Sequence, residues 1–215
     1  MIADPDRLPS NPTAIDTVCL IDASPSMREP DYPPSRFAAA LDAATALIAQ
    51  KARHRPRDRV AIALFSGSSW IAVSLRPVGA LAGALPKLEP SGYGTDIHAA
   101  LRTAAVHLDI ATQPPRAHLF RRPDPPHQRP TPGHLVLLSD GEHNRDSQPA
   151  QLADVIKAQN CLIECVGIGD RAAVNEALLK RIASNGPDGR PRYRFIGDRA
   201  TLIDDFRVKA MLQVL

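Results

Sequence analysis

A chain of 215 residues is long enough for one α/β domain whose core needs no disulfide bonds. The sequence is 44% hydrophobic and 23% charged, which excludes an intrinsically disordered chain. Its net charge is only +3 and its basic residues form no long stripe, so a nucleic-acid partner is not expected.

The expected compartment is the cytoplasm, with no membrane partner. No apolar stretch approaches the roughly 18 residues that span a bilayer, and residues 1–13 lack the basic and then apolar order of a signal peptide. Cys19, Cys161 and Cys165 lie within apolar runs, which indicates buried, reduced thiols; a thiolate metal site is the weaker alternative.

Residues 1–14 are polar and contain several prolines, and we predict an N-terminal tail before a single domain over residues 15–215. The run from Ile15 to Ile21 is almost continuously apolar, which is typical of a central strand buried on both faces. Asp22 follows this strand directly.

The rest of the chain alternates between helical and extended patterns. After the helix cap Ser35, apolar residues recur at helical spacing from Phe37 to Ile48. Segments 59–67 and 70–77 predict two strands, and their connection is too short for a parallel crossover, so they form an antiparallel hairpin. The further predictions, in chain order, are a helix at 79–88, a helix at 97–109, a strand at 134–140, a helix at about 148–160, a strand at 161–168, a helix at 171–184, a strand at 192–196 and a helix at about 199–212.

Strands that alternate with helices predict a doubly wound, Rossmann-like and mostly parallel sheet with helices on both faces. The hairpin adds one antiparallel edge strand. Ligands of such sheets bind outside the carboxyl ends of the strands, where the strand order reverses. Asp22 and Asp140 each end a strongly apolar strand, so the functional site is expected at that edge.

The connection at 111–133 is a Pro/Arg-rich insertion in this domain. It holds seven prolines, four arginines and a single acidic residue, Asp124. Connections of this length are uncommon in compact domains unless they have a function or lack order. A docking arm in polyproline II conformation and a simple surface insertion are both compatible with the composition.

Oxygen-bearing side chains follow the first strand at alternate positions. Asp22, Ser24 and Ser26 can turn their oxygens to one side of the loop. One carboxylate and two hydroxyls form a hard ligand set that suits Mg²⁺, and also Mn²⁺ or Ca²⁺. Thr95 and Asp140 would add two oxygens, which leaves about one position of an octahedral ion for water or a ligand.

Each of these segments also has a simpler explanation. Ser24 or Ser26 is compatible with a turn or a cap, and Asp140 with Gly141 is a common turn pair. Asp96 is better explained as a helix cap than as a sixth ligand. Their joint position at the ends of core strands favours the metal site.

The segments DASPSM (22–27), GTDI (94–97) and LLSDGEHN (137–144) resemble the three loops of the metal-ion-dependent adhesion site of von Willebrand factor A (vWA) domains. Their order and separations are similar to that family's, and the resemblance runs from about residue 15 to 208. The family's ligand pattern matches Asp22, Ser24, Ser26, Thr95 and Asp140. The resemblance implies the vWA fold, Mg²⁺ as the usual metal, and an acidic side chain of a partner protein that completes the coordination.

Pro25 stands where the family commonly has glycine. Proline fixes φ near about −65° and has no N–H, so this loop must have a negative φ at that position. A metal-free relative with the same fold is therefore a third alternative for this chain.

A rim around the metal is predicted from residues near the motif loops. Tyr32 is expected to be exposed, in the proline-rich loop 28–34 on the metal side. His98, Glu142 and His143 are the other rim candidates, with solvated side chains as the alternative.

The favoured function is a protein-binding module, not an enzyme, that captures an exposed Asp or Glu of a partner through bound Mg²⁺. The alternative is a Mg²⁺-dependent phosphoester hydrolase. That chemistry usually needs more carboxylates than Asp22 and Asp140 supply. The resemblance further implies a bacterial multi-protein system, such as one with a MoxR-type AAA+ ATPase.

Overall fold

The computed structural model describes residues 14–81, 85–112, 131–140 and 143–210. The strands are β1 (Asp16–Asp22), β2 (Arg59–Phe65), β3 (Ser69–Pro77), β4 (Gly133–Ser139), β5 (Cys161–Gly167) and β6 (Tyr193–Phe195). The helices are α1 (Arg36–His54), α2 (Ile97–His107), α3 (Pro149–Lys157), α4 (Glu176–Ile182) and α5 (Arg199–Lys209). Two short 3-10 helices are η1 (Pro25–Arg28) and η2 (Val78–Ala80). The predicted tail, the larger part of the predicted insertion, and Glu142 lie outside the described residues.

The six strands form one sheet in the order β3-β2-β1-β4-β5-β6. β3 pairs antiparallel with β2, and every other pair is parallel. The predicted doubly wound sheet with one antiparallel edge strand is therefore confirmed. The strand order reverses between β1 and β4, so the carboxyl ends of these two strands lie side by side, and Asp22 and Asp140 stand at that point.

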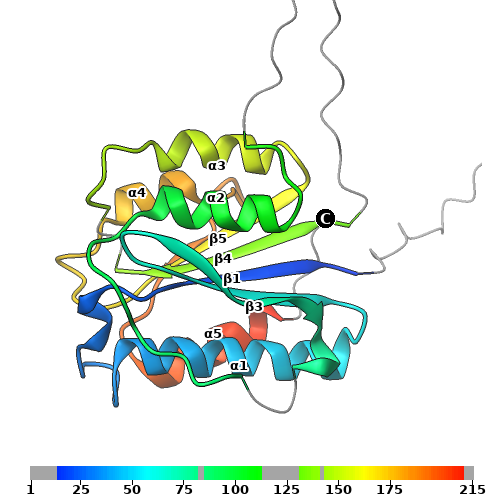
Figure 1. Ribbon diagram of the computed structural model, residues 1–215, viewed down its shortest axis with the longest axis horizontal. Coiled ribbons are helices and arrows are strands. Elements are labelled where there is room, and N and C mark those ends of the chain that lie inside the picture. Colours follow the sequence, from blue (N-terminus) through cyan, green and yellow to red (C-terminus); the bar gives the residue numbers. More distant parts are fainter. Residues whose placement is uncertain (1–13, 82–84, 113–130, 141–142, 211–215) are drawn as a thin grey trace, which may run out of the picture.

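Helices cover both faces of the sheet, with α1 and α5 on one side and α2, α3 and α4 on the other (Figure 1). A hydrophobic core lies on each face of the sheet, and successive residues of β1 point into one and then the other. Ile21 packs toward α1 and α5, and Leu20 toward α2 and α3. Every residue of β1 is buried, which explains the apolar run Val18–Ile21 within it.

Both predicted helix caps are present. The Ser35 hydroxyl accepts a hydrogen bond from the backbone N–H of Ala38 at 3.1 Å. The Asp96 carboxylate accepts one from the N–H of Ala99 at 3.0 Å. Asp96 thus begins α2, which is the role preferred for it over that of a metal ligand.

The predicted helix at 79–88 is wrong. Of the described residues in this segment, the 3-10 turn Val78–Ala80 alone is helical, and residues 85–90 have no regular structure. Pro86 has no N–H to donate, and glycine and proline within so short a segment outweigh its apolar pattern. Val78 and Leu81 are still buried, and they hold the segment against the α1 side of the sheet. The predicted helix at 171–184 is shorter than expected and begins at Glu176.

All three cysteines are buried and free, as predicted. Burial raises the pKa of the Cys19 thiol to about 12, so it stays protonated. None of the described helices is both long and apolar enough to cross a bilayer.

A buried ion pair ties the sheet together at the end opposite Asp22. The Asp58 carboxylate accepts hydrogen bonds from the N–H of Ile15 at 3.0 Å, Lys51 Nζ at 2.6 Å and Arg55 Nε at 3.0 Å. Asp58 and Lys51 are each 1% exposed. This contact joins the start of β1 to the end of α1 and the start of β2.

Asp58→Ala would leave the Lys51 ammonium buried without its partner, and we expect a loss of about 3–5 kcal/mol in the free energy of unfolding. Urea denaturation measures it. Asp204→Ala is the control, because it removes an exposed partner of Arg207 and should cost less than about 0.5 kcal/mol. Equal losses in the two variants would contradict this role of Asp58.

Candidate metal centre

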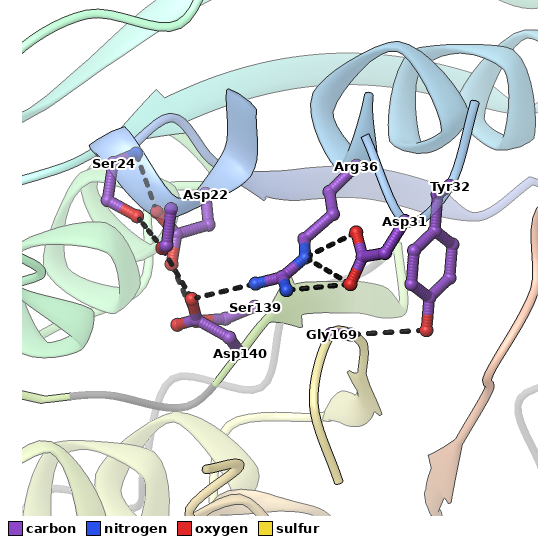
Figure 2. Close-up of polar contacts among 9 residues, drawn as sticks. Asp22, Ser24, Asp31, Tyr32, Arg36, Ser139, Asp140 and Gly169 are labelled. Carbon is purple, nitrogen blue, oxygen red and sulfur yellow. Dashed lines mark hydrogen bonds and ion pairs between the residues drawn. The ribbon is translucent and has the colours of Figure 1, made fainter. Parts of the chain in front are cut away.

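Side-chain oxygens from two loops meet at the reversal of strand order. The Ser24 and Ser26 hydroxyl oxygens lie 3.1 Å apart, and Ser26 Oγ donates to Asp140 Oδ2 at 2.5 Å. Asp22 Oδ1 accepts a hydrogen bond from the N–H of Ser24 at 2.8 Å, which fixes the turn after β1 (Figure 2). Four of the five predicted ligands therefore form one cluster, here called the oxygen cluster: Asp22, Ser24, Ser26 and Asp140.

Pro25 is compatible with this arrangement. It is the first residue of η1, a position where the fixed φ of proline suits a helix and its missing N–H is not needed. Ser24, before it, has φ −63° and ψ 164°, the extended backbone that proline favours in its predecessor. The N–H of Met27 donates to the carbonyl of Ser24 at 3.1 Å and closes the turn. The substitution of proline for glycine thus leaves both serine hydroxyls together.

Thr95 is carried to the same edge by its own loop. It is 3% exposed, and its N–H donates to Asn144 Oδ1 at 2.9 Å. The N–H of Asn144 in turn donates to the Thr95 carbonyl at 3.2 Å, and the N–H of Asp96 donates to the Ser66 carbonyl at 2.6 Å. These bonds attach the loop to the segments that follow β4 and β2, the neighbours of β1. The hydrogen bonds that define the oxygen cluster join its four members to one another, and Thr95 lies beside them without being part of the cluster.

The Asp22 carboxylate lies in an unfavourable position for a negative charge. It is fully buried, and Ser139 Oγ donates to its Oδ2 at 2.7 Å. Burial, and then the charge of Asp140, raise the pKa of Asp22 to about 7, although hydrogen bonds from Ser24 and Ser139 oppose the rise. A cation placed between the two carboxylates would stabilise the ionised form of Asp22 against both its burial and the charge of Asp140.

The chemistry of this ligand set fits a hard divalent ion. Carboxylate and hydroxyl oxygens are the ligands that Mg²⁺, Mn²⁺ and Ca²⁺ prefer. In the described part of the chain, no three acidic, histidine or cysteine side chains gather into a metal-binding group. Metal binding here would therefore depend on the hydroxyls of Ser24, Ser26 and Thr95 as well as on two carboxylates.

Two residues beside the cluster, Arg36 and Ser139, were not predicted from the sequence. Arg36, the first residue of α1, makes a forked contact with the Asp31 carboxylate, through Nε at 2.8 and 3.0 Å and Nη2 at 2.7 Å. Its other terminal nitrogen, Nη1, lies 3.8 Å from Asp140 Oδ2. Ser139 was also missed, although it precedes Asp140. No sequence motif singles out Arg36, because only the fold brings the start of α1 to the end of β4.

Tyr32 does not form part of a rim, and its expected exposure is wrong. Its side chain is 1% exposed and packs into the core on the α1 side. The phenolic O–H donates to the Ile196 carbonyl and accepts from the N–H of Gly169 at 3.1 Å. Burial raises its pKa, and the ring anchors the loop after η1 to the segments that follow β5 and β6. An aromatic residue among prolines was mistaken for a surface contact.

The two histidines of the predicted rim are half-buried. His143 Nδ1 accepts from the N–H of Ile97 at 3.3 Å, and Nε2 lies 3.2 Å from both the hydroxyl and the carbonyl oxygen of Ser147. His143 therefore connects the loop after β4 to the start of α2. His98 has a buried Nδ1 for which the described residues offer no hydrogen-bond partner. Contact of either ring with a partner protein stays a prediction.

Tyr93 is an exposed aromatic residue that the sequence analysis passed over. Its side chain is 85% exposed, two residues before Thr95. Gly92 and Gly94 on either side have φ of +91° and +72°, a conformation that glycine adopts readily. An aromatic residue between two glycines in the loop 91–96 was the available signal. The exposed aromatic ring near the oxygen cluster is therefore that of Tyr93, on the loop that carries Thr95, and not that of Tyr32.

Solved structures with the same fold extend over nearly the whole chain. Proximal thread matrix protein 1 from the mussel byssus is similar with a TM-score of 0.68 and 17% identity, over 94% of this chain and 46% of that chain. Another structure of it is described as having zinc in its MIDAS motif, the metal-ion-dependent adhesion site. It has a TM-score of 0.65 and 17% identity, over 92% of this chain and 46% of that chain. The present chain thus spans about half the length of the mussel protein.

Two further structures are matched over nearly their full length. BatB from Bacteroides thetaiotaomicron has a TM-score of 0.61 and 19% identity, over 91% of this chain and 98% of that chain. The vWA domain of SpRpn10 has a TM-score of 0.62 and 22% identity, over 89% and 92%. At these identities the likeness shows the fold alone.

The sequence itself was also compared with protein families and with curated proteins. No curated protein matches the chain. The family model described as the von Willebrand factor type A domain matches residues 17–143, from within β1 to the loop after β4. This match covers more than half of the 215 residues and includes the oxygen cluster and Thr95, so the chain belongs to the vWA domain family.

Proposed function

We propose that this vWA domain is a metal-dependent protein-binding module, in which a bound Mg²⁺ captures an acidic side chain of a partner. The observation that carries the proposal is the oxygen cluster, with two carboxylates and two hydroxyls at the reversal of strand order. vWA domains are generally protein-interaction modules, which agrees with this use of the site.

Several features support a metal at this position. Asp22, Ser24, Ser26 and Asp140 already lie together, and Thr95 is held at the same sheet edge. The raised pKa of Asp22 indicates a deficit of positive charge. The zinc described in the mussel protein shows that a relative in fold holds a metal in its motif. An all-oxygen ligand set favours Mg²⁺ over zinc in the present chain, with Mn²⁺ and Ca²⁺ as substitutes.

A metal held by these ligands would suit capture better than hydrolysis. Such an ion attracts a partner's carboxylate, and the surrounding loops would select the partner. Phosphoester hydrolysis usually requires a nucleophile or carboxylates for a second metal. Asp22 and Asp140 are the acidic members of the oxygen cluster, and Asp96 is engaged as a helix cap. The binding module is therefore the better supported of the two.

The partner surface is proposed to include the loop of Tyr93. Exposed tyrosines supply large apolar area and a polar hydroxyl, and they are enriched among residues that dominate interface energies. Two predictions about the partner remain untested: that it belongs to a MoxR-type AAA+ ATPase system, and that binding takes place in the cytoplasm.

Mg²⁺ should raise the melting temperature of the wild-type protein and leave that of Asp22→Asn nearly unchanged. At about 100 times the dissociation constant, ligand binding adds about 2.7 kcal/mol, which corresponds to roughly 5–10 °C in a domain of this size. Thermal unfolding with Mg²⁺ and with EDTA measures the shift. Asp204→Asn, at an exposed aspartate, should respond like wild type. If none of Mg²⁺, Mn²⁺ and Ca²⁺ raises the melting temperature of the wild-type protein, the metal-free alternative is supported.

Without metal, Asp22→Asn should stabilise the protein at pH 8 but not at pH 4. The folded-state pKa of Asp22 is about 7, above the value of about 3.9 expected when unfolded, so ionisation above pH 4 progressively costs folding free energy, and the cost is complete above pH 7. Asparagine avoids that cost, and we expect a gain on the order of 4 kcal/mol at pH 8. Urea denaturation in EDTA at both pH values tests it. An equal gain at pH 4 would mean that ionisation of Asp22 is not the cause.

Capture of a partner should require metal, Asp22 and Tyr93. Tagged wild-type protein, Asp22→Asn and Tyr93→Ala are compared in pull-downs with Mg²⁺ or EDTA, and cross-linking locates the partner's contact. We expect at least about tenfold weaker binding for Tyr93→Ala, typical of a dominant interface residue. Val106→Ala, at an exposed apolar residue of α2, is the control. The proposal fails if changing the partner's contacting Asp or Glu to Asn or Gln leaves binding intact.

A further inference from the structure

Arg36 stands between two carboxylates with different surroundings. The Asp31 side chain is 40% exposed and binds the fork of Nε and Nη2, whereas the Asp140 side chain is 7% exposed and faces Nη1 at 3.8 Å. Figure 2 shows the guanidinium lying between the two aspartates, with the oxygen cluster beyond Asp140. The charge of Arg36 is thus shared between a surface anchor and a residue of the oxygen cluster.

This position of Arg36 is closely confined. Its side chain is 11% exposed, and a Cβ built on Gly169 would lie 2.7 Å from Nη1 and 2.9 Å from Cζ. The guanidinium therefore packs directly on the backbone of Gly169. A cation so enclosed acts at nearly constant distance from Asp140, with little screening by solvent.

Two negative charges of the oxygen cluster would attract a divalent ion, and one positive charge opposes it. Asp22 and Asp140 are the carboxylates, and Arg36 is the nearby cation. A metal neutralised by two carboxylates has little attraction left for a third. If Arg36 offsets part of the Asp140 charge, the ion is held less tightly but keeps more of its attraction for an incoming carboxylate.

We propose that Arg36, anchored by Asp31 and packed on Gly169, is a positioning residue that lowers the affinity of the oxygen cluster for its metal and thereby strengthens binding of a partner's carboxylate. This inference rests on the proposed function. It adds a residue that sets the affinity of the site for the metal relative to the affinity of the bound metal for a partner's carboxylate. Asp31 limits the effect by drawing the guanidinium fork toward itself.

Removal of the charge at position 36 should have opposite effects on the two ligands. We expect Arg36→Met to bind Mn²⁺ about tenfold more tightly than wild type, because one nearby positive charge is gone. The Mn²⁺-loaded variant should bind acetate, a probe for a partner's carboxylate, several-fold more weakly than wild type. Calorimetric titration gives the Mn²⁺ affinity, and the relaxation rate of water protons on Mn²⁺ reports displacement by acetate.

Companion variants separate charge from shape. Arg36→Lys keeps the charge but cannot make the fork to Asp31, so its affinities for both ligands should lie between those of wild type and Arg36→Met. Asp31→Asn removes the carboxylate that offsets part of the Arg36 charge, so more of that charge acts on Asp140, and Mn²⁺ binding should weaken about threefold. In Arg36→Met/Asp31→Asn the Asp31 substitution should have little further effect, because its influence acts through Arg36. Arg199→Met is the matched control, because Arg199 also begins a helix and forks onto an aspartate, Asp42, away from the cluster.

The outcomes distinguish this inference from the proposed function. If wild type fails to bind Mn²⁺ and Mg²⁺, the proposed function is overturned, and this inference with it. If wild type binds Mn²⁺ but Arg36→Met binds it equally or more weakly, only the role of Arg36 is overturned. Tighter Mn²⁺ binding together with weaker acetate binding supports it, since loss of a merely structural contact would weaken both. Should Arg36→Met not fold, a wild-type affinity for Mn²⁺ in Asp31→Asn likewise overturns the role.

Discussion

The carboxylate of Asp22 is removed from water at the end of a strand that is buried on both faces, and it lies near the carboxylate of Asp140. Two like charges in a poorly solvated position oppose folding unless something offsets them. A backbone N–H and the Ser139 hydroxyl hydrogen-bond to Asp22, and the Ser26 hydroxyl to Asp140. Each of these hydrogen bonds offsets part of the charge, and the Arg36 guanidinium, 3.8 Å from Asp140 Oδ2, adds a single positive charge against two negative ones. The two carboxylates therefore lower the free energy of unfolding, which the packing of the rest of the sheet offsets. A bound divalent ion would remove this destabilisation.

The arrangement of strands explains why this cost falls on one place. β1 and β4 are central and parallel, and between them the chain changes the direction in which it adds strands. The helices that leave these two strands lie on opposite faces, so the carboxyl ends are left uncovered by either one (Figure 1). Loops from β1, β4 and the start of α2 converge there. At the amino ends, Asp58 instead joins strand and helix through full ion pairs, which is a contact that stabilises without leaving an open position.

The fold and the oxygen cluster were predictable from sequence because their signals are local. A continuous apolar run identified β1, a three-residue connection identified the hairpin, and alternate oxygen side chains after β1 identified the cluster. The joint position of Asp22 and Asp140 followed from a general rule on parallel sheets. The helix at 79–88 failed because glycine and proline outweighed an apolar pattern too short to decide.

The residues around the ligands were less predictable because their roles depend on distant parts of the chain. Tyr32 looks like a surface residue among prolines, yet Gly169 and the Ile196 carbonyl supply its hydroxyl with buried partners. Arg36 begins a helix like many arginines, and only the adjacency of α1 and β4 brings it to Asp140. Pro25 departs from the family pattern but suits the first position of η1, which becomes evident once the helical turn is known.

The contact between Gly169 and Arg36 has a consequence for how the chain can change over evolutionary time. Position 169 has φ of +98° and no room for a side chain while the guanidinium is present. A larger residue at 169 requires that the guanidinium shift or that residue 36 become smaller, and that the local backbone change as well. The two positions are therefore expected to vary together among relatives. Lineages that lose Arg36 would be the ones free to rebuild the loop after β5.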